Sequence, residues 1–195
     1  MNQPRLYMLL LGCTPRGRHT EQHDVLFAIG ASLRHCIPSI VDFWPEAEGK
    51  IHIDAWREVA RVDGYDVKVV DGRAEGGVAD GGADLPDAGT RLYFINLGGY
   101  KPGEFDEFHY KMIVAAGDKG EAIKKAKETA FYRHTGFKGA ESHIDDKYGI
   151  DVDDAYAIHD ILLADVKSRY TITLTQAGDA VEDELHLGYF QLKHL

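Results

Sequence analysis

The sequence is poor in cysteine and in basic residues, and it has no long apolar run. Cys13 and Cys36 are its two cysteines, too few for a disulfide-built fold or a four-thiolate zinc site. Acidic residues outnumber basic ones by 32 to 22, a formal net charge of −10. This disfavours nucleic-acid binding, because phosphate backbones attract clustered Lys and Arg. No stretch approaches the roughly 18 apolar residues of a membrane span, so we expect no membrane segment.

The N-terminal run Leu6–Cys13 looks like a lipoprotein signal, because it is apolar, follows Arg5 and ends in Leu-Leu-Gly-Cys. Its apolar part is only about seven residues, at the lower limit for a secretion signal. The same pattern recurs well inside the chain, at Arg91–Gly98. A segment that occurs twice, once internally, is structural. We therefore expect two buried β-strands closed by glycine, and a cytoplasmic protein.

An internal repeat organises the sequence. Residues 5–24 align with residues 91–110, and eight of the twenty positions are identical, against roughly one in twenty by chance. Further along, His52-Ile53-Asp54 matches His143-Ile144-Asp145. We therefore predict an internal duplication. Its parts are a first repeat at 1–70, a Gly/Asp-rich linker at 71–90, and a second repeat at 91–195 with extra C-terminal strands.

Each repeat has the pattern of a β-β-α-β unit. Apolar runs of strand length predict the strands, and apolar residues at helical spacing predict one helix per repeat, beginning near Ser32 and near Asp118. Pro38 interrupts the first helix, where it would remove a hydrogen bond. The expected strands are 5–11, 22–30 and 65–70, then 91–97, 108–116 and 156–161, and finally 170–175 and 184–192. The expected fold class is α+β with mostly antiparallel sheets.

The loop from Gly12 to Thr20 has the glycine spacing of a phosphate-binding P-loop. That motif needs Lys and then Ser or Thr directly after its second glycine, where this chain has Arg18 and His19. The second repeat has Glu104 at the position of Arg18, and an acidic side chain would repel phosphate. We therefore expect a hairpin connection that uses glycine for its turn.

Both repeats place a glutamate two residues before a histidine at the start of the second strand, and a His-x-Asp triplet further on. Residues i and i+2 of a strand point to the same side, so each carboxylate adjoins an imidazole. If the two pairs converge, each repeat offers enough ligands to bind Zn²⁺, or a carboxylate to orient a histidine for acid–base chemistry. The alternative is structural, with hydrogen-bonded pairs at strand ends and turns. The candidate residues are Glu21, His23, His52 and Asp54, and Glu107, His109, His143 and Asp145.

Several of these residues give the sequence a family resemblance. The segments that carry it are Leu11-Gly12, Glu21-x-His23-Asp24, His52-Ile-Asp-Ala-Trp56-Arg-Glu and Val62-Asp-Gly-Tyr65. They resemble DUF1543, a small bacterial family of unknown function whose members carry one or two copies of a short domain. Residues 91–156 carry a weaker version, with Tyr110 in place of Asp24 and Lys147 in place of Trp56. The resemblance implies a duplicated domain, and it implies no activity, cofactor or catalytic residue.

Two classes of function fit these observations. The leading one is a non-enzymatic module that binds a small molecule or a protein, with a homodimer formed through exposed strand edges. The alternative is a divalent-metal-dependent enzyme, a hydrolase, that uses the Glu-x-His and His-x-Asp pairs. The binding module leads because no established nucleophile–base set, phosphate loop or complete metal motif stands out in the sequence. The cofactor, if any, is left open.

Overall fold

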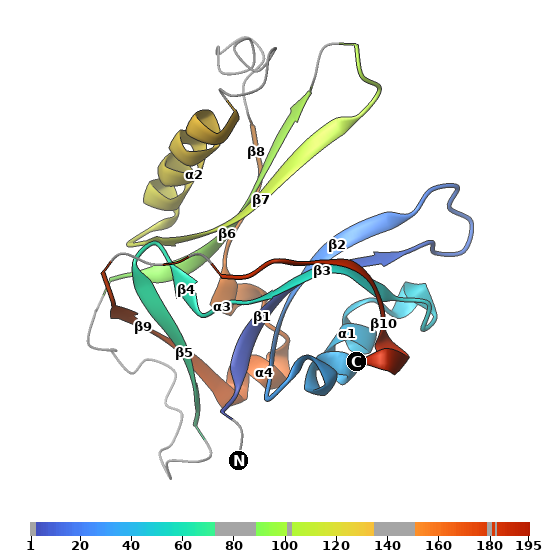
Figure 1. Ribbon diagram of the computed structural model, residues 1–195, viewed down its shortest axis with the longest axis horizontal. Coiled ribbons are helices and arrows are strands. Elements are labelled where there is room, and N and C mark those ends of the chain that lie inside the picture. Colours follow the sequence, from blue (N-terminus) through green and yellow to red (C-terminus); the bar gives the residue numbers. More distant parts are fainter. Residues whose placement is uncertain (1–2, 73–88, 101–102, 135–150, 179–180, 182) are drawn as a thin grey trace. The chain divides into compact units, whose positions relative to one another are not determined.

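The computed structural model of the protein describes residues 3–72, 89–100, 103–134, 151–178, 181 and 183–195 (Figure 1). The chain divides into two compact units. Unit 1 comprises Met1–Pro86 with Ile161–Leu195, and unit 2 comprises Asp87–Asp160. Both units combine helices with antiparallel strand pairs, which confirms the predicted α+β class. Among the described helices, none combines the length and apolar character that crossing a membrane requires.

A four-stranded antiparallel sheet dominates unit 1, in the order β10-β3-β1-β2. Its strands are β1 (Arg5–Cys13), β2 (Gln22–Gly30), β3 (His52–Glu58) and β10 (His186–Gln191). Alternate residues of β1, among them Leu9 and Leu11, pack with Cys36 and Ile40 into a buried core, as the strand period of two requires. Gly12, near the end of β1, pairs with His23 and His52, two of the candidate residues.

The segment after β2 contains short helices rather than the single helix that the apolar spacing predicted. The elements are η1 (Leu33–Cys36), α1 (Ile37–Phe43) and η2 (Pro45–Ala47). Pro38 explains the division, because it stands in the first turn of α1, where its missing N–H costs nothing. Ser32 is the N-cap residue of η1, but its hydroxyl is hydrogen-bonded with His35 Nδ1 at 2.7 Å rather than with the helix backbone.

A smaller sheet completes unit 1, in the order β4-β5-β9. The elements are β4 (Arg61–Val62), β5 (Tyr65–Asp71), α4 (Ala164–Arg169), β9 (Tyr170–Gln176) and, after β10, η4 (Leu192–His194). The sequence predicted strands at the positions of β9 and β10, but assigned both to the second repeat at 91–195. Instead β9 pairs with β5 and β10 pairs with β3, so the chain from Ile161 onward groups with the first half.

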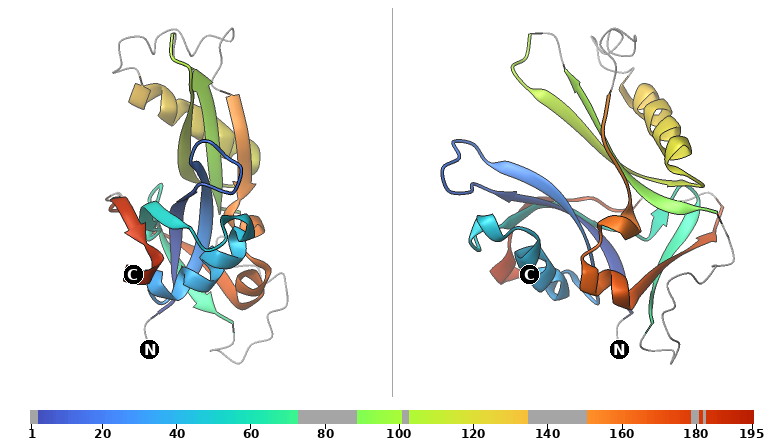
Figure 2. Two further views of the ribbon diagram at one scale, coloured as in Figure 1. Left: turned by 90° about the vertical axis from the view of Figure 1, so that its right-hand side faces the viewer. Right: turned by 180° about the vertical axis from the view of Figure 1, so that it is seen from behind.

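Unit 2 is a three-stranded antiparallel sheet, in the order β7-β6-β8, with helix α2 along one face (Figure 2). The elements are β6 (Arg91–Tyr100), β7 (Glu107–Ala116), α2 (Lys119–His134), β8 (Asp151–Ala157) and α3 (Ile158–Ile161), which ends at the boundary of the unit. Ala122 of α2 packs with Ile95 of β6 in a buried cluster. The predicted capping pair is present, because the Glu121 N–H donates to Asp118 and the Gly117 N–H donates to the Glu121 carboxylate, each at 2.8 Å.

The strand expected at 156–161 is wrong in its position. The last strand of unit 2 begins at Asp151 and pairs with β6 as far as Ala157, and the chain then turns into α3. The segment from Tyr156 to Ile161 is short and mixes apolar with polar residues, and a segment of that length fits a strand and a helical turn equally well. Its first residues complete β8 and the rest form the helix, with Ile158 fully buried.

Candidate metal centre

Three neighbouring strands bring four candidate residues of unit 1 together. Gly12 of the central strand β1 pairs with His23 of β2 on one side and with His52 of β3 on the other. Glu21 directly precedes β2. The pairing of β1 with β3 shifts by one residue opposite Asp54, which is the extra residue of a β-bulge. The Asp54 carboxylate lies on the same side of the sheet as His52, as the strand period of two predicts.

The four side chains alternate, imidazole and carboxylate, in what we call the unit 1 cluster. His52 Nε2 lies 3.1 Å from Glu21 Oε1 and 3.2 Å from Asp54 Oδ1. His23 Nε2 lies 3.2 Å from Asp54 Oδ2 and 3.6 Å from Glu21 Oε2. Each carboxylate therefore presents one oxygen to each imidazole. The Glu-x-His and His-x-Asp pairs of the first repeat lie side by side.

His52 is the buried member of this cluster, with only 5% of its surface exposed. Its Nε2 makes no hydrogen bond, although two carboxylate oxygens lie nearby, and Asp54 Oδ2 is likewise buried without a hydrogen bond. A buried polar atom left without a partner costs about 1–3 kcal/mol. The ring of Tyr189, from β10, packs against the His52 imidazole with 4.2 Å between ring centroids. The imidazole is thus held in place with its Nε2 directed at the carboxylates.

The absence of a side chain at Gly12 makes room for the unit 1 cluster. A Cβ there would lie 2.3 Å from Asp54 Oδ2 and 2.6 Å from His52 Nε2, far closer than ordinary contacts. Gly98 of β6 has the same relationship to a carboxylate, because a Cβ there would lie 2.3 Å from Asp153 Oδ2. At these two positions glycine is needed because polar side chains cross directly over the backbone.

Unit 2 gathers a second group around Gly98. This glycine, in the central strand β6, pairs with His109 of β7 and with Asp151 of β8, and Asp153 is the extra residue where the β6–β8 pairing shifts. His109 Nε2 lies 3.3 Å from Asp153 Oδ2. Among the described residues, Glu107, His109 and Asp153 are the group of His, Cys, Asp and Glu whose ligand atoms all lie within 4.8 Å of one another. We call these three residues the unit 2 cluster; all of them are exposed.

The register of β8 places a second polar-apolar-polar triplet beside the central glycine of unit 2. The sequence repeat matched His52–Asp54 with His143–Asp145, which lies outside the described residues. In the sheets, the strand positions of His52–Asp54 beside the central glycine are taken in unit 2 by Asp151–Asp153. The sequence analysis therefore missed Asp153. Its signal was the same polar-apolar-polar alternation, with a carboxylate where the first repeat has an imidazole.

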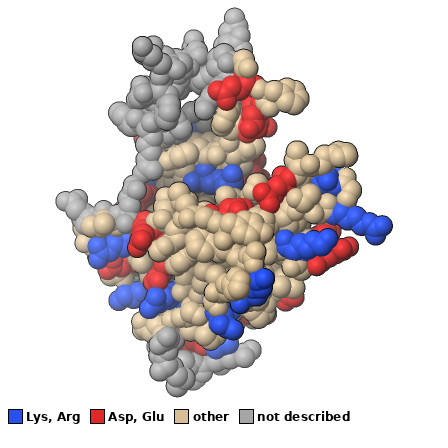
Figure 3. Space-filling view, turned by 45° about the vertical axis from the view of Figure 1, so that its right-hand side comes forward, with Lys and Arg blue, Asp and Glu red and all other residues tan. Residues whose placement is uncertain are grey.

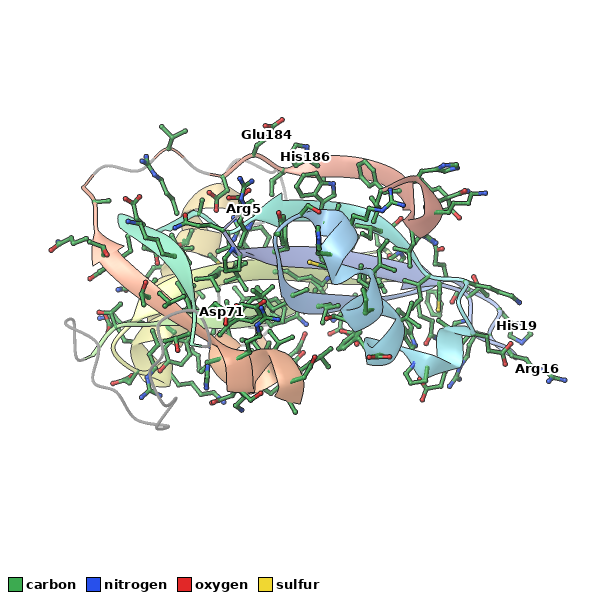
Figure 4. All side chains as sticks on the ribbon, turned by 90° about the horizontal axis from the view of Figure 1, so that it is seen from below. Arg5, Arg16, His19, Asp71, Glu184 and His186 are labelled. Atoms are coloured by element: carbon green, nitrogen blue, oxygen red, sulfur yellow. The ribbon has the colours of Figure 1, made fainter. Side chains whose placement is uncertain are left out.

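The loop that resembles a P-loop is the turn of a hairpin. It joins the antiparallel strands β1 and β2, whereas a P-loop leads from a strand into a helix. Gly17 has a φ of +81°, which supplies the turn conformation that the sequence analysis expected of glycine. His19 is exposed and lies with Arg16 at the tip of this loop (Figure 4).

The two cysteines are not candidates for nucleophilic catalysis. Cys13 and Cys36 are both buried free thiols. Burial raises the pKa of Cys36 to about 12 and also raises the pKa of Cys13. Because the thiolate is the reactive form, both side chains are inert in the folded protein.

Charge is mixed on the surface. On the face shown in Figure 3, Lys and Arg side chains are interspersed with Asp and Glu, and the described residues form no continuous basic field there. Nucleic-acid binding needs such a field. This face therefore offers no support for it, in line with the net charge of −10.

Comparison with curated protein sequences finds no match. Among solved structures, the crystal structure of a protein Il1583 from Idiomarina loihiensis is similar over 97% of both chains, with a TM-score of 0.59 and 21% sequence identity. At this identity the likeness concerns the fold alone. Residues 18–69, which include all four members of the unit 1 cluster, match the family described as Domain of Unknown Function (DUF1543), so this segment of the chain is similar to that family.

Proposed function

We propose that the protein binds a divalent metal ion at the unit 1 cluster, through Glu21, His23, His52 and Asp54. The observation that carries this proposal is His52 Nε2, a buried nitrogen that lies beside two carboxylates without a hydrogen bond. Neutral imidazole is the commonest metal ligand among side chains. A bound ion would accept the lone pair of Nε2 and remove the cost of leaving that atom unpartnered.

Charge balance also supports a cation at this position. The carboxylates of Glu21 and Asp54 face each other across the two imidazoles, and together they carry a charge of about −2 when ionised. The ion pairs found within the unit 1 cluster link these carboxylates to His23 and His52. A divalent ion would neutralise both carboxylates while both histidines stay neutral, which is the form that binds metal.

The donor set indicates the metal and the role of the site. Two imidazoles and two carboxylates suit Zn²⁺, with Mn²⁺, Fe²⁺ and Ni²⁺ as competitors. The ligand atoms of the unit 1 cluster are spread more widely than those of the unit 2 cluster, so its side chains would have to rotate onto one ion. The four protein groups would then fill the tetrahedral coordination that zinc adopts in structural sites. Hydrolysis needs a coordination position for water, which such a site does not leave. We therefore propose a structural role for the metal at unit 1 and not hydrolysis.

We also infer that the two units descend from one duplicated segment. Support comes from the matching surroundings of Gly12 and Gly98, each in the central strand of its sheet and paired with a histidine, His23 or His109, of the following strand. The third strand of each set carries a bulge, at Asp54 and at Asp153. A duplicated backbone plan accounts for all three correspondences together.

Zinc titration of metal-stripped, tag-free protein, in competition with a chromophoric chelator, tests the proposal. Removing His52, one of four ligands, should weaken zinc binding at unit 1 at least about 100-fold, so we expect this loss in His52→Ala. His19→Ala is the matched control, because it removes an exposed histidine near the same strand and should leave the affinity unchanged. Failure of the wild-type protein to bind Zn²⁺, Mn²⁺ or Ni²⁺ would contradict the proposal. So would a His52→Ala variant that binds zinc as tightly as wild type.

A further inference from the structure

We infer that unit 2 holds a second metal site, formed by Glu107, His109 and Asp153, which keeps a coordination position open for an oxygen ligand from solution. The inference rests on the proposed metal binding of unit 1 and extends it to a site of different chemistry. The unit 2 cluster has one imidazole where the unit 1 cluster has two.

The strands flanking Gly98 supply the three donors. Glu107 and His109 are two residues apart on β7, so their side chains emerge on the same side. Asp153 is the bulged residue of β8, and its side chain crosses over β6. Its Oδ2 lies 3.3 Å from Nε2 of His109. All three ligand atoms lie within 4.8 Å of one another. Two donors on one ion with bonds of about 2.2 Å lie at most about 4.4 Å apart, so small side-chain rotations bring all three onto a single ion.

Gly98 provides an independent observation that the Asp153 carboxylate belongs over this strand. A Cβ on Gly98 would lie 2.3 Å from Asp153 Oδ2 and 2.9 Å from both Cγ and Oδ1. The missing side chain at Gly98 therefore leaves room for the Asp153 carboxylate, as the missing side chain at Gly12 leaves room for Asp54.

The number of protein ligands separates the two clusters, three in unit 2 against four in unit 1. Exposure does not separate them, because the side chains of His109 and Asp153 are 35% and 31% exposed and those of His23 and Glu21 are 42% and 43% exposed; His52 is the buried member of unit 1. Catalytic zinc sites combine three protein ligands with one water or substrate oxygen. An ion held by the unit 2 cluster would have that arrangement, and it would lower the pKa of a bound water or accept a carboxylate or hydroxamate oxygen. The hydrolase alternative therefore belongs to unit 2.

Cobalt(II) is the probe, because its visible d–d spectrum reports coordination. In a His23→Ala, His52→Ala background, which removes both imidazoles of the unit 1 cluster, we expect one Co²⁺ per chain and a spectrum that changes when acetohydroxamate is added. His109→Ala and Asp153→Ala in this background should lose both signals. His159→Ala removes an exposed histidine of the same unit and should keep them. We expect His143→Ala to keep them too, because Glu107, His109 and Asp153 already supply the three ligands.

Each outcome separates the two claims. A wild-type protein that binds one ion, which His52→Ala removes, would overturn the second site and leave the unit 1 proposal standing. A cobalt spectrum unmoved by acetohydroxamate would overturn the open position, and loss of cobalt in His143→Ala with retention in Asp153→Ala would overturn the assignment. Failure of both units to bind metal would overturn both claims. Circular dichroism checks folding, and Glu21→Ala and Glu107→Gln replace any variant that does not fold.

Discussion

Gly12 and Asp54 approach each other so closely that a Cβ on Gly12 would lie 2.3 Å from Asp54 Oδ2. Gly12 is in the central strand of its sheet, and Asp54 is the bulged residue of the neighbouring strand. The carboxylate thus reaches across the bare backbone of β1 to meet His23, which lies in the strand on the other side. One missing side chain and one extra residue together bring the unit 1 cluster into contact.

Gly12→Ala should abolish tight zinc binding and leave the protein folded. The new methyl group would displace the ends of two side chains, Asp54 and His52, which can rotate away, so we expect a stability loss within about 1–3 kcal/mol. Gly99→Ala is the control, because a Cβ at Gly99 would meet nothing within 4 Å. Zinc titration and urea unfolding measure the two effects. A Gly12→Ala variant with wild-type zinc affinity would show that the close approach does not position the ligands.

Cys36 should be almost unreactive toward Ellman's reagent in the folded protein. Its side chain is fully buried and its pKa is raised to about 12, so its thiolate fraction at pH 8 is lower than that of an ordinary thiol by roughly a thousandfold. A Cys13→Ser variant isolates Cys36, and labelling is compared before and after unfolding in urea. Rapid labelling of the folded variant would contradict the burial of Cys36 and reopen a chemical role for it.

Asp183 connects the segment before β10 to the turn after β3. Its carboxylate accepts hydrogen bonds from the backbone N–H groups of Ala60 and Arg61, both at 3.1 Å. Burial nevertheless raises the pKa of Asp183 above its ordinary value of 3.8. The folded protein therefore holds this proton more tightly than the unfolded chain does. Its contribution to the free energy of unfolding consequently falls as pH rises from the ordinary pKa through the raised one.

Asp183→Asn should remove this pH dependence. The free energy of unfolding of the wild type minus that of Asp183→Asn should therefore decrease as pH rises from about 3 to about 7. Urea denaturation at several pH values across this interval measures the difference. A difference that increases with pH would mean that the hydrogen bonds from Ala60 and Arg61 outweigh burial.

We propose that two copies of the chain pair through β10. This strand is at the edge of its sheet, and two of its side chains, Leu187 and Tyr189, are 74% and 65% exposed. Edge strands with apolar side chains readily pair with another chain. Leu187→Lys should shift the protein toward the monomer in light scattering, whereas Val41→Lys, on α1, should not. A wild-type protein that is monomeric at every concentration would rule out the pairing.

The Glu-x-His pairs could be predicted from the sequence because they depend only on the strand period of two. Glu21 and His23 lie on one side for that reason, and the strands that carry the pairs were found at the expected places. The sequence did not predict whether Glu21 and His23 lie close to His52 and Asp54. This depends on which strands flank β1 and on the bulge at Asp54, and neither has a local signature.

The sequence also did not predict which strands pair with the C-terminal strands β9 and β10. The apolar and β-branched residues of β9 and β10 predict strands, but pairing across more than a hundred residues is decided by the packing of the whole unit. The second predicted His-x-Asp pair, His143–Asp145, lies outside the described residues and stays a prediction. Asp151–Asp153 was missed because its place beside Gly98 depends on the pairing of β8 with β6, which has no local signature.

Anomalous X-ray diffraction at the zinc absorption edge, on crystals of zinc-loaded protein, tests the central claim most directly. The account predicts an anomalous peak within bonding distance, about 2.0–2.2 Å, of the Nε2 atoms of His23 and His52 and of oxygens from Glu21 and Asp54. Crystals that contain zinc only on other side chains, or that leave His52 Nε2 hydrogen-bonded to protein atoms without an ion, would contradict it.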